Sequence, residues 1–451
     1  MFPSPARPSV PQANPDRPIG GRRVSLSQVL PFVGPDTLDT AVNPTIQPDR
    51  ILADLSALIA IPSVTGDEIA VQDRIAELLT AAGLDVTRID ADPRALSLDP
   101  AWPGAEMPRQ SLPVVAGTWR GRREGPRILL VGHVDVVPPG DVRNWSSPPF
   151  DPVVRDGHVY GRGACDMKGG VVAALEAIRA IAESGIELAG EVVMLTVPSE
   201  EDGGGGALAA IRAGFTGDMA VIPEPTRLDV VTAHAGAITF TLDVPGKAAH
   251  ASTRREGVSA LDKVMVLLQA LSADEQQRNA SEVNPLMRAI GLPYPTIIGK
   301  INGGEWASTV LDRVVVEGRY GVRLGQSVDA AAADLRRAID TAWGRDEFLC
   351  QFPVRLEVTG GRFGSGEVPQ DHPLPTGIAA AAERVTGRRP ALVGVPYGAD
   401  MRMFVTEGDT PCVMYGPGDV RLAHSADERV PVDEVVTCAR VLCNWLETTL
   451  V

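Results

Sequence analysis

Cysteine is scarce in this chain, and long apolar runs are absent. Its five cysteines are scattered along 451 residues and form no CxxC pair. An odd, scattered set argues against a disulfide framework or a zinc finger and favours a reducing compartment, so we expect a cytoplasmic protein. No apolar run approaches the ~18 residues of a membrane span, and the N-terminus lacks the apolar core of a signal peptide.

Positive charge is also in short supply. The chain has 42 Lys and Arg residues against 57 Asp and Glu residues, a formal net charge of −15. This acidic balance argues against nucleic acid or an anionic membrane as a partner. The hydrophobic content of 44% can support a proper core, and the length exceeds that of one typical domain. We therefore expect a soluble protein with two domains.

Composition and periodicity divide the chain into four segments. Residues 1–48 are rich in proline, and we predict an irregular arm that is either a disordered tail or packs on the body or a neighbouring subunit. Strands alternate with helices through 49–235, and this pattern resumes in 367–451. Residues 236–366 predict an antiparallel sheet with helices on one face. The expected fold class is α/β, with a mixed, mostly parallel sheet between helices and an inserted α+β domain.

The first helix after residue 60 has recognisable boundary signals. Thr65 and Glu68 are spaced as in a capping box, in which Thr65 caps the helix backbone and Glu68 reaches back. The apolar stripe that follows stops before Gly83, a residue type that commonly ends helices. We therefore predict a helix that runs to about Ala82.

Side chains of the metal-binding type recur where predicted strands end. Three strands end in this way, at His133 and Asp135, at Glu200 and Glu201, and at Glu224. In α/β sheets, ligands collect at the carboxyl ends of the strands. We therefore expect these side chains to meet at one point. Taken singly, each has an ordinary alternative, such as a structural His–Asp pair or a solvated turn.

Asp166 stands in the glycine-rich turn GRGACDMKGG (161–170), which leads into an apolar helix. Alone, this turn could simply cap that helix, and His424, one of six histidines, could be an ordinary loop residue. Together with His133, Glu201 and Glu224 they supply two His, one Asp and two Glu, which suits two Zn²⁺-like ions sharing Asp166.

Two further residues have expected roles beside these ligands. Asp135 lies two residues after His133 on a strand, so both point to the same face and Asp135 can fix the imidazole tautomer. Glu200 and Glu201 are adjacent carboxylates that would repel one another unless their tasks differ. We expect one of the pair to bind metal and Glu200 to carry a proton to the leaving amine.

Four motifs together resemble one metallo-amidohydrolase and peptidase family. They are GHVDVVP (132–138), GRGACDMKGG (161–170), PSEEDGGGGA (198–207) and AHSADE (423–428). The family contains acetylornithine deacetylase, succinyl-diaminopimelate desuccinylase, aminoacylase-1 and glutamate carboxypeptidase, and the resemblance covers roughly residues 50–451. It implies a two-zinc exopeptidase-like catalytic domain and a ferredoxin-like lid, which commonly forms a homodimer.

The resemblance also implies roles for individual residues. It assigns two ligand pairs and a residue that bridges the two ions: His133 with Glu224, Glu201 with His424, and Asp166 between them. It makes Glu200 the general base and Asp135 the partner of His133, and the bond between Asp166 and Met167 is a candidate cis peptide. Zn²⁺ fits this donor set best, and Co²⁺ or Mn²⁺ could also occupy it.

Pocket residues follow from the same resemblance. His250 matches a lid histidine that stabilises the oxyanion, often in the partner subunit. Arg323 stands where the family places an arginine that holds a substrate carboxylate. Asp400 and Arg402 belong to a loop that lines the substrate pocket, and Asn284 is a further candidate for substrate binding.

The expected function is that of a two-metal amidohydrolase that removes an N-acyl group from a small amino-acid-like substrate. Gly321 departs from the acidic residue that most members carry two positions before the lid arginine. The stretch GGEWASTV (303–310) resembles a deacylase subgroup that includes a thiamin-salvage formamide hydrolase. The alternatives are a dipeptidase, aminopeptidase or carboxypeptidase of the same family and, more remotely, a non-catalytic metal-binding scaffold.

Overall fold

The computed structural model describes residues 44–450. The arm predicted for residues 1–48 lies outside this range except for residues 44–48. Within the described range, no helix has the length and apolar character needed to cross a membrane. Two large hydrophobic cores form, one around a large mixed sheet and one in the segment between residues 236 and 363, and a small third cluster surrounds Met287 and Tyr294.

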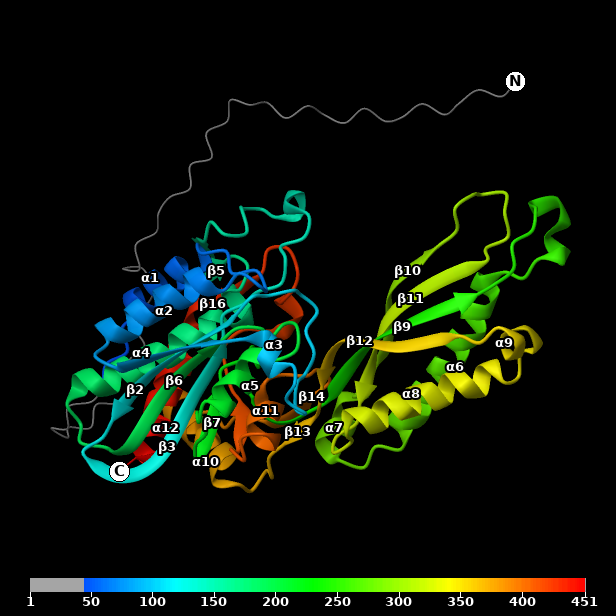
Figure 1. The fold of residues 1–451 in the computed structure, drawn as a ribbon. Helices are drawn as coiled ribbons and strands as arrows, with labels where there is room; N and C mark the ends of the chain where they lie inside the picture. The colour runs from blue at the N-terminus through cyan, green and yellow to red at the C-terminus, as the bar shows by residue number, and fades with distance from the viewer. Residues whose placement is uncertain (1–43, 451) are drawn as a thin grey trace, which may run out of the picture. The chain divides into compact units, whose positions relative to one another are not determined.

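The larger sheet has nine strands, in the order β1-β2-β6-β3-β7-β15-β8-β13 with β14 paired to β8. Figure 1 labels β2, β6, β3 and β7 of this sheet. The central strands β6, β3, β7 and β15 run parallel, whereas β1, β2 and β13 join by antiparallel pairs. The sheet is therefore mixed, as expected. Its strands are β1 (Asp85–Ala91), β2 (Leu112–Arg120), β3 (Arg123–His133), β6 (Ala189–Val197), β7 (Met219–Ile222), β8 (Val230–His234), β13 (Gly366–Glu367), β14 (Leu392–Val395) and β15 (Cys412–Met414).

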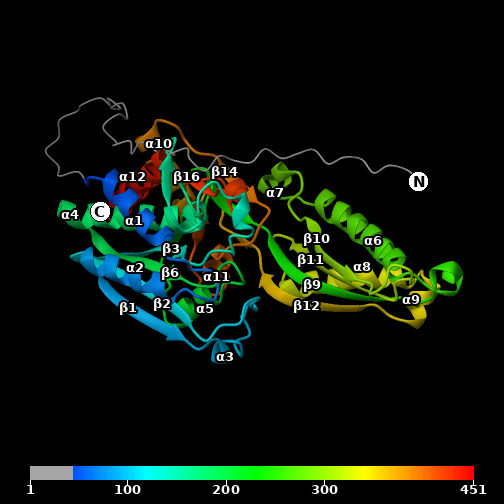
Figure 2. The ribbon, with the colours of Figure 1, turned by 90° about the horizontal axis from the view of Figure 1, so that it is seen from above.

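Helices cover both faces of this sheet, which confirms the predicted α/β class. One layer contains α1 (Pro48–Ile59), α4 (Gly169–Ser184), α10 (Pro373–Thr386) and α12 (Val432–Thr449). The opposite layer contains α2 (Ile69–Ala81), α5 (Gly205–Arg212) and α11 (Met401–Thr406), with the short α3 (Pro93–Leu96) against α5. In Figure 2, α4 and α12 lie on one side of β3 and β6, and α2 lies on the other. The apolar stripes of both layers bury against the sheet.

A second sheet, of four antiparallel strands, forms the lid. The strand order is β10-β11-β9-β12, and α6 and α8 pack on one face (Figure 2). Its buried positions alternate along β9, as expected for a sheet with one covered face. The elements are β9 (Gly236–Pro245), α6 (Ala260–Ala280), α7 (Pro285–Ile290), β10 (Thr296–Gly303), β11 (Arg313–Val322), α8 (Val328–Trp343), α9 (Glu347–Gln351) and β12 (Arg355–Phe363).

A small third sheet brings two distant segments together. It consists of β4 (Val153–Arg155), β5 (His158–Tyr160) and β16 (Arg429–Pro431), in the order β16-β5-β4. The antiparallel register places Arg429 opposite Tyr160. As a result, the loop that carries His424 lies beside the turn that carries Asp166.

The predicted capping box is wrong. The helix begins at Ile69, and Thr65 does not cap it. Instead, the main-chain N–H of Thr65 donates to Val136 O (3.0 Å) and its hydroxyl donates to Asp135 Oδ2 (3.1 Å). Docking against the end of β3 therefore outweighs the local cap. The Glu68 carboxylate still accepts a local hydrogen bond, from the N–H of Gly66 (2.7 Å).

Candidate metal centre

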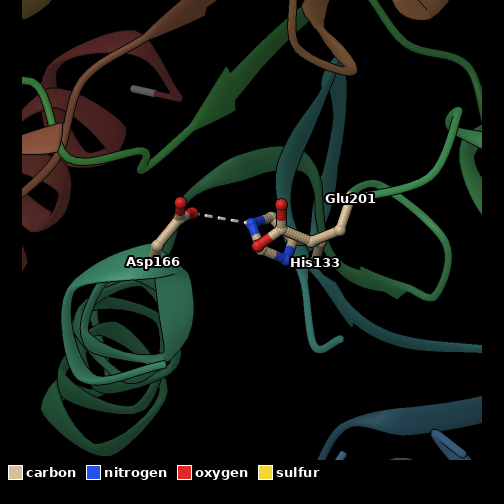
Figure 3. Close-up of side chains that lie close together, drawn as sticks. All are labelled: His133, Asp166 and Glu201. Atoms are coloured by element: carbon tan, nitrogen blue, oxygen red, sulfur yellow. Dashed lines mark hydrogen bonds and ion pairs between the residues drawn. The ribbon is translucent and has the colours of Figure 1, made fainter. Parts of the chain in front are cut away.

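Asp166 lies between two imidazoles. Its Oδ1 is 3.0 Å from His133 Nε2, and its Oδ2 is 3.4 Å from His424 Nε2. Ligand-type atoms of His133, Asp166 and Glu201 all lie within 4.8 Å of one another (Figure 3). Each carboxylate oxygen of Asp166 therefore faces a different histidine, as a residue shared by two ions would require.

Each imidazole also has a carboxylate of its own. Glu224 Oε1 is 3.8 Å from His133 Nε2, and Glu201 Oε2 is 3.0 Å from His424 Nε2. The structure thus groups the side chains into the two pairs that the sequence led us to expect, with Asp166 between them. An imidazole, a terminal carboxylate and a shared carboxylate form a donor set that suits Zn²⁺ and similar divalent ions.

The parallel centre of the large sheet delivers four of these residues. His133 is the last residue of β3, Glu201 follows β6, Glu224 follows β7, and His424 lies in the loop region after β15. These four strands are neighbours and run in the same direction. Their carboxyl ends therefore open at one edge of the sheet, where ligands bind in folds of this class.

The fifth residue, Asp166, comes from an irregular turn. Gly163 has a φ of 81°, a left-handed conformation that glycine adopts at little cost. Asp166 itself has φ −118° and ψ 97°, so the chain is not helical there, and the Asp166–Met167 peptide bond is cis. Helix α4 then starts close to β7, because a Cβ on Gly170 would lie 1.9 Å from Pro223 O. This close approach sets Asp166 near Glu224.

Asp135 has a different main contact from the one expected. His133 Nδ1 is 2.9 Å from the main-chain oxygen of Asp135, whereas the Asp135 carboxylate is 3.7 Å away. The carboxylate instead accepts the N–H groups of Glu200 and Glu201, each at 3.2 Å, and the hydroxyl of Thr65. The backbone carbonyl orients the imidazole, and the carboxylate orients the Glu200–Glu201 turn.

The cluster carries more negative charge than its own histidines neutralise. Burial raises the pKa of Glu200 and of Glu224 well above the usual range, and raises that of Glu201 to about 7. Hydrogen bonds to Asp166 and Glu201 raise the pKa of His424 to about 11. Repulsion among buried carboxylates is the condition that a divalent cation relieves, so the residues fit metal ions.

A cavity of about 350 Å³ adjoins this cluster. Glu200 and four of the five ligand-type residues line one side of it, the exception being His133. The lid contributes Ile297 from β10, Arg319 from β11 and Phe363 from β12, and Tyr397 follows β14. The cavity is therefore acidic at the cluster and mainly apolar elsewhere, with one arginine on the lid side.

None of the five predicted pocket residues lines this cavity. His250 is exposed, with Nδ1 2.8 Å from Ser252 Oγ. Asn284 caps α7, since its Oδ1 accepts two main-chain N–H groups, and its Nδ2 donates to Glu367 (2.8 Å). Strand β11 ends at Val322, so Arg323 already belongs to the following turn.

Asp400 and Arg402 lie beneath the cavity rather than in its wall. Each is only 2% exposed. The Arg402 guanidinium donates to the carbonyl oxygens of Ala399 and Gly203. Both Asp400 carboxylate oxygens are buried without a hydrogen-bond partner among the described residues, and burial raises the Asp400 pKa to about 6. The pair supports the floor of the cavity and the turn after Glu200.

The sequence reasoning missed Arg319, Phe363 and Tyr397. Arg319 had a usable signal, because it is exposed between buried Gly318 and Tyr320 on an alternating strand. Phe363 and Tyr397 had none, because both reach the cavity through chain connections that only the fold defines. The Arg319 guanidinium lies 5.1 Å from the centre of the Phe363 ring.

Comparison with known proteins identifies the family. The sequence profile of Peptidase family M20/M25/M40 matches residues 129–448. The chain belongs to this family. Members of the M20/M25/M40 family hydrolyse amide bonds, and this chain is accordingly a metal-dependent hydrolase of that kind.

Two relatives of this M20-family chain are deacylases. Succinyl-diaminopimelate desuccinylase of Methylobacterium nodulans is 31% identical over 399 residues, which cover 85% of this chain and 92% of that protein. N-formyl-4-amino-5-aminomethyl-2-methylpyrimidine deformylase of Bacillus subtilis is 27% identical, over 71% of this chain and 78% of that protein.

Solved peptidase structures share the fold. The aminopeptidase PepT of Bacillus cereus superposes with a TM-score of 0.66 at 22% identity, covering 90% of this chain and 99% of that one. A metallo-carboxypeptidase of Sulfolobus solfataricus gives 0.69 at 15% identity, covering 88% and 99%. These similarities show that the fold is shared.

Proposed function

We propose that this protein is a two-metal amidohydrolase that removes an N-acyl group from a small amino-acid-like substrate. One observation carries the proposal: Asp166 lies between two imidazoles, each with its own terminal carboxylate, and the cavity that Asp166 lines also contains Glu200. The deacylase relatives support the choice of an acyl group over a peptide.

Bound divalent ions, for which Zn²⁺ is our first choice, would polarise the amide carbonyl and lower the pKa of a water molecule. His133 and Glu224 would hold one ion, Glu201 and His424 the other, and Asp166 both. Among these residues the imidazoles must be neutral to bind, so metal and protons compete for the site.

Glu200 is proposed to move the proton. Its carboxyl is buried beside the ligands, and this burial raises its pKa, which favours uptake of a proton by the carboxylate. The N–H of Glu200 is held by Asp135 Oδ1 (3.2 Å), which fixes the turn from which the side chain projects. Glu200 would accept a proton from water and donate it to the departing nitrogen.

A substrate panel tests this function. We expect the Zn²⁺- or Co²⁺-loaded enzyme to hydrolyse N-acyl substrates, measured side by side on N-acetylornithine, succinylated diaminopimelate, N-acyl amino acids and dipeptides. Metal-free enzyme assayed in parallel controls for contaminating activity. Turnover confined to dipeptides would favour the peptidase alternative, and two bound metals without hydrolysis of any amide would favour a non-catalytic scaffold.

Arg319 is proposed to bind the anionic group of the substrate. It is an arginine on the lid side of an otherwise acidic and apolar cavity, and it lies over Phe363 rather than against a carboxylate of the described chain. A hydrogen bond to a charged group contributes about 1.5–3 kcal/mol. Arg319→Met should therefore lower kcat/KM for a carboxylate substrate by about 10–100-fold.

The measurement compares an N-acyl amino acid with its carboxamide in each variant. Arg319→Met should lower kcat/KM for the acid but hardly change it for the carboxamide. Arg323→Met is the matched control, because Arg323 follows the end of β11 and does not line the cavity. Equal loss for acid and carboxamide would contradict the proposed contact, as would a larger effect at Arg323.

A homodimer through the lid and a cytoplasmic location are also proposed. Strand β10 is an edge strand of the lid sheet, and Ile301 on it is exposed. Leu261 and Met265 are exposed on α6. Exposed apolar side chains beside a free sheet edge are typical of association sites. In such a dimer, His250 would act in its own or in the partner's active site.

A further inference from the structure

Glu428 is a buried carboxylate whose contacts converge on the turn that carries Asp166. It is 1% exposed. Its Oε1 accepts the main-chain N–H groups of Cys165 and Asp166, both at 3.0 Å, and its Oε2 accepts from Arg162 Nη1 at 2.5 Å. One side chain therefore receives three donors from residues 162–166.

These hydrogen bonds satisfy main-chain donors that lie before α4. Helix α4 begins at Gly169, and the backbone at Asp166 is not helical. Buried N–H groups need an acceptor, and Glu428 Oε1 supplies one for both. The orientation of the Asp166 side chain therefore depends on a carboxylate 262 residues away in sequence.

Glu428 also belongs to the segment that carries His424. It lies four residues after His424 and directly before β16. Its main-chain oxygen accepts the N–H of Gly161 (2.9 Å), and Arg429 then pairs with Tyr160. Through its backbone and its side chain, Glu428 connects the Asp166 turn to the His424 loop.

Arg162 holds the Glu428 carboxylate in place. Arg162 is 2% exposed, and its guanidinium lies 5.1 Å from the centre of the Trp145 ring. A guanidinium so enclosed has few alternative positions. The buried charge pair therefore has a defined geometry, and Glu428 Oε1 is left free to accept the two N–H groups.

We propose that Glu428 is a positioning residue, which keeps Asp166 oriented between the two metal ions without binding either of them. The inference rests on the proposed two-metal site. The proposal predicts that the affinity for metal depends on Glu428, although Glu428 is not a ligand. Hydrogen-bonding partners that orient metal-binding side chains have this effect on affinity in other metal sites.

Zinc affinity, measured by competition with a chromophoric chelator, tests the proposal without any substrate. Glu428→Gln should weaken Zn²⁺ binding about 10–100-fold, because a neutral amide accepts N–H groups less strongly and its NH₂ group faces Arg162. Glu428→Asp should weaken it as well, because the shorter side chain cannot reach Arg162 and both N–H groups together. Excess Zn²⁺ should restore most of the turnover of both variants with little change in KM.

Glu176→Gln is the matched control. Glu176 is 0% exposed, accepts the N–H of Gln47 (2.7 Å) and pairs with Arg50 (2.7 Å), but it touches no predicted ligand. Loss of this buried carboxylate should lower the thermal stability of metal-free protein to a similar degree as Glu428→Gln, with Zn²⁺ affinity unchanged. The comparison separates positioning of Asp166 from general stability.

Wild-type zinc affinity in Glu428→Gln or in Glu428→Asp would overturn the proposal, as would an equal loss of affinity in Glu176→Gln. If Glu428→Gln does not fold, the zinc affinity of Glu428→Asp tests the proposal, because aspartate keeps a negative charge opposite Arg162. Failure of the wild-type protein itself to bind Zn²⁺ would instead overturn the proposed two-metal function.

Discussion

Glu200→Gln is expected to leave the metal ions bound while kcat falls by about 10²–10⁴-fold, the contribution of a positioned acid or base. Glutamine keeps the shape of the side chain but cannot accept and return a proton. The backbone contact of residue 200 with Asp135 involves the main chain, so the substitution should leave the turn in place. KM should change little, because Glu200 is not proposed to hold the substrate.

The measurement combines steady-state kinetics with elemental analysis of the same preparation. Glu201→Gln is a useful comparison, because Glu201 Oε2 lies 3.0 Å from His424 Nε2 and Glu201 is proposed as a ligand. Glu201→Gln should lose metal and activity together, whereas Glu200→Gln should lose activity alone. Near-normal turnover by fully metal-loaded Glu200→Gln would disprove the role proposed for Glu200.

Asp166→Asn is expected to remove both ions. Asp166 Oδ1 faces His133 and Oδ2 faces His424, so a neutral amide there deprives both half-sites of a shared negative charge. Two-metal stabilisation supplies several kcal/mol, so turnover should fall by about 10³–10⁴-fold at ordinary metal concentrations. Elemental analysis should find less than one ion per chain.

Single substitutions in the terminal carboxylates are the matched controls for Asp166→Asn. Glu224 lies beside His133, and Glu201 lies beside His424. Glu224→Gln and Glu201→Gln should therefore each lose one of the two ions preferentially. Retention of one full ion in Asp166→Asn would contradict the shared role. A metal-loaded crystal structure in which the Asp166 carboxylate lies more than about 4 Å from both ions would also contradict it, because the two ions of such sites are themselves only about 4 Å apart.

Four of the five predicted ligand residues follow a local pattern in the sequence, whereas His424 was predicted only in combination with them. His133 and Glu224 end apolar strands, and Asp166 sits in a glycine-rich turn before a helix. Apolar runs of this kind predict buried strands whatever their neighbours, and an α/β alternation places their carboxyl ends at one edge. The predicted fold class followed from the same alternation.

The substrate side of the cavity was less readable. Arg323 was chosen by its position in a motif, but β11 ends one residue earlier and Arg319 lines the cavity instead. Asn284 is an N-cap, a local role that the residue Pro285 after it already favours. Phe363 and Tyr397 reach the cavity from separate segments, so no local pattern connects them with the cluster.

The sequence by itself determined the chemistry of this protein: the donor types, their placement at strand ends and in turns, and the alternation that makes the large sheet. Only the tertiary structure decided how these donors are held. It assigned the Asp135 carboxylate to the Glu200–Glu201 turn and Glu428 to the Asp166 turn. The physical reason is that apolar periodicity is local, whereas a buried N–H donates to whichever carboxylate the packing of distant segments places beside it.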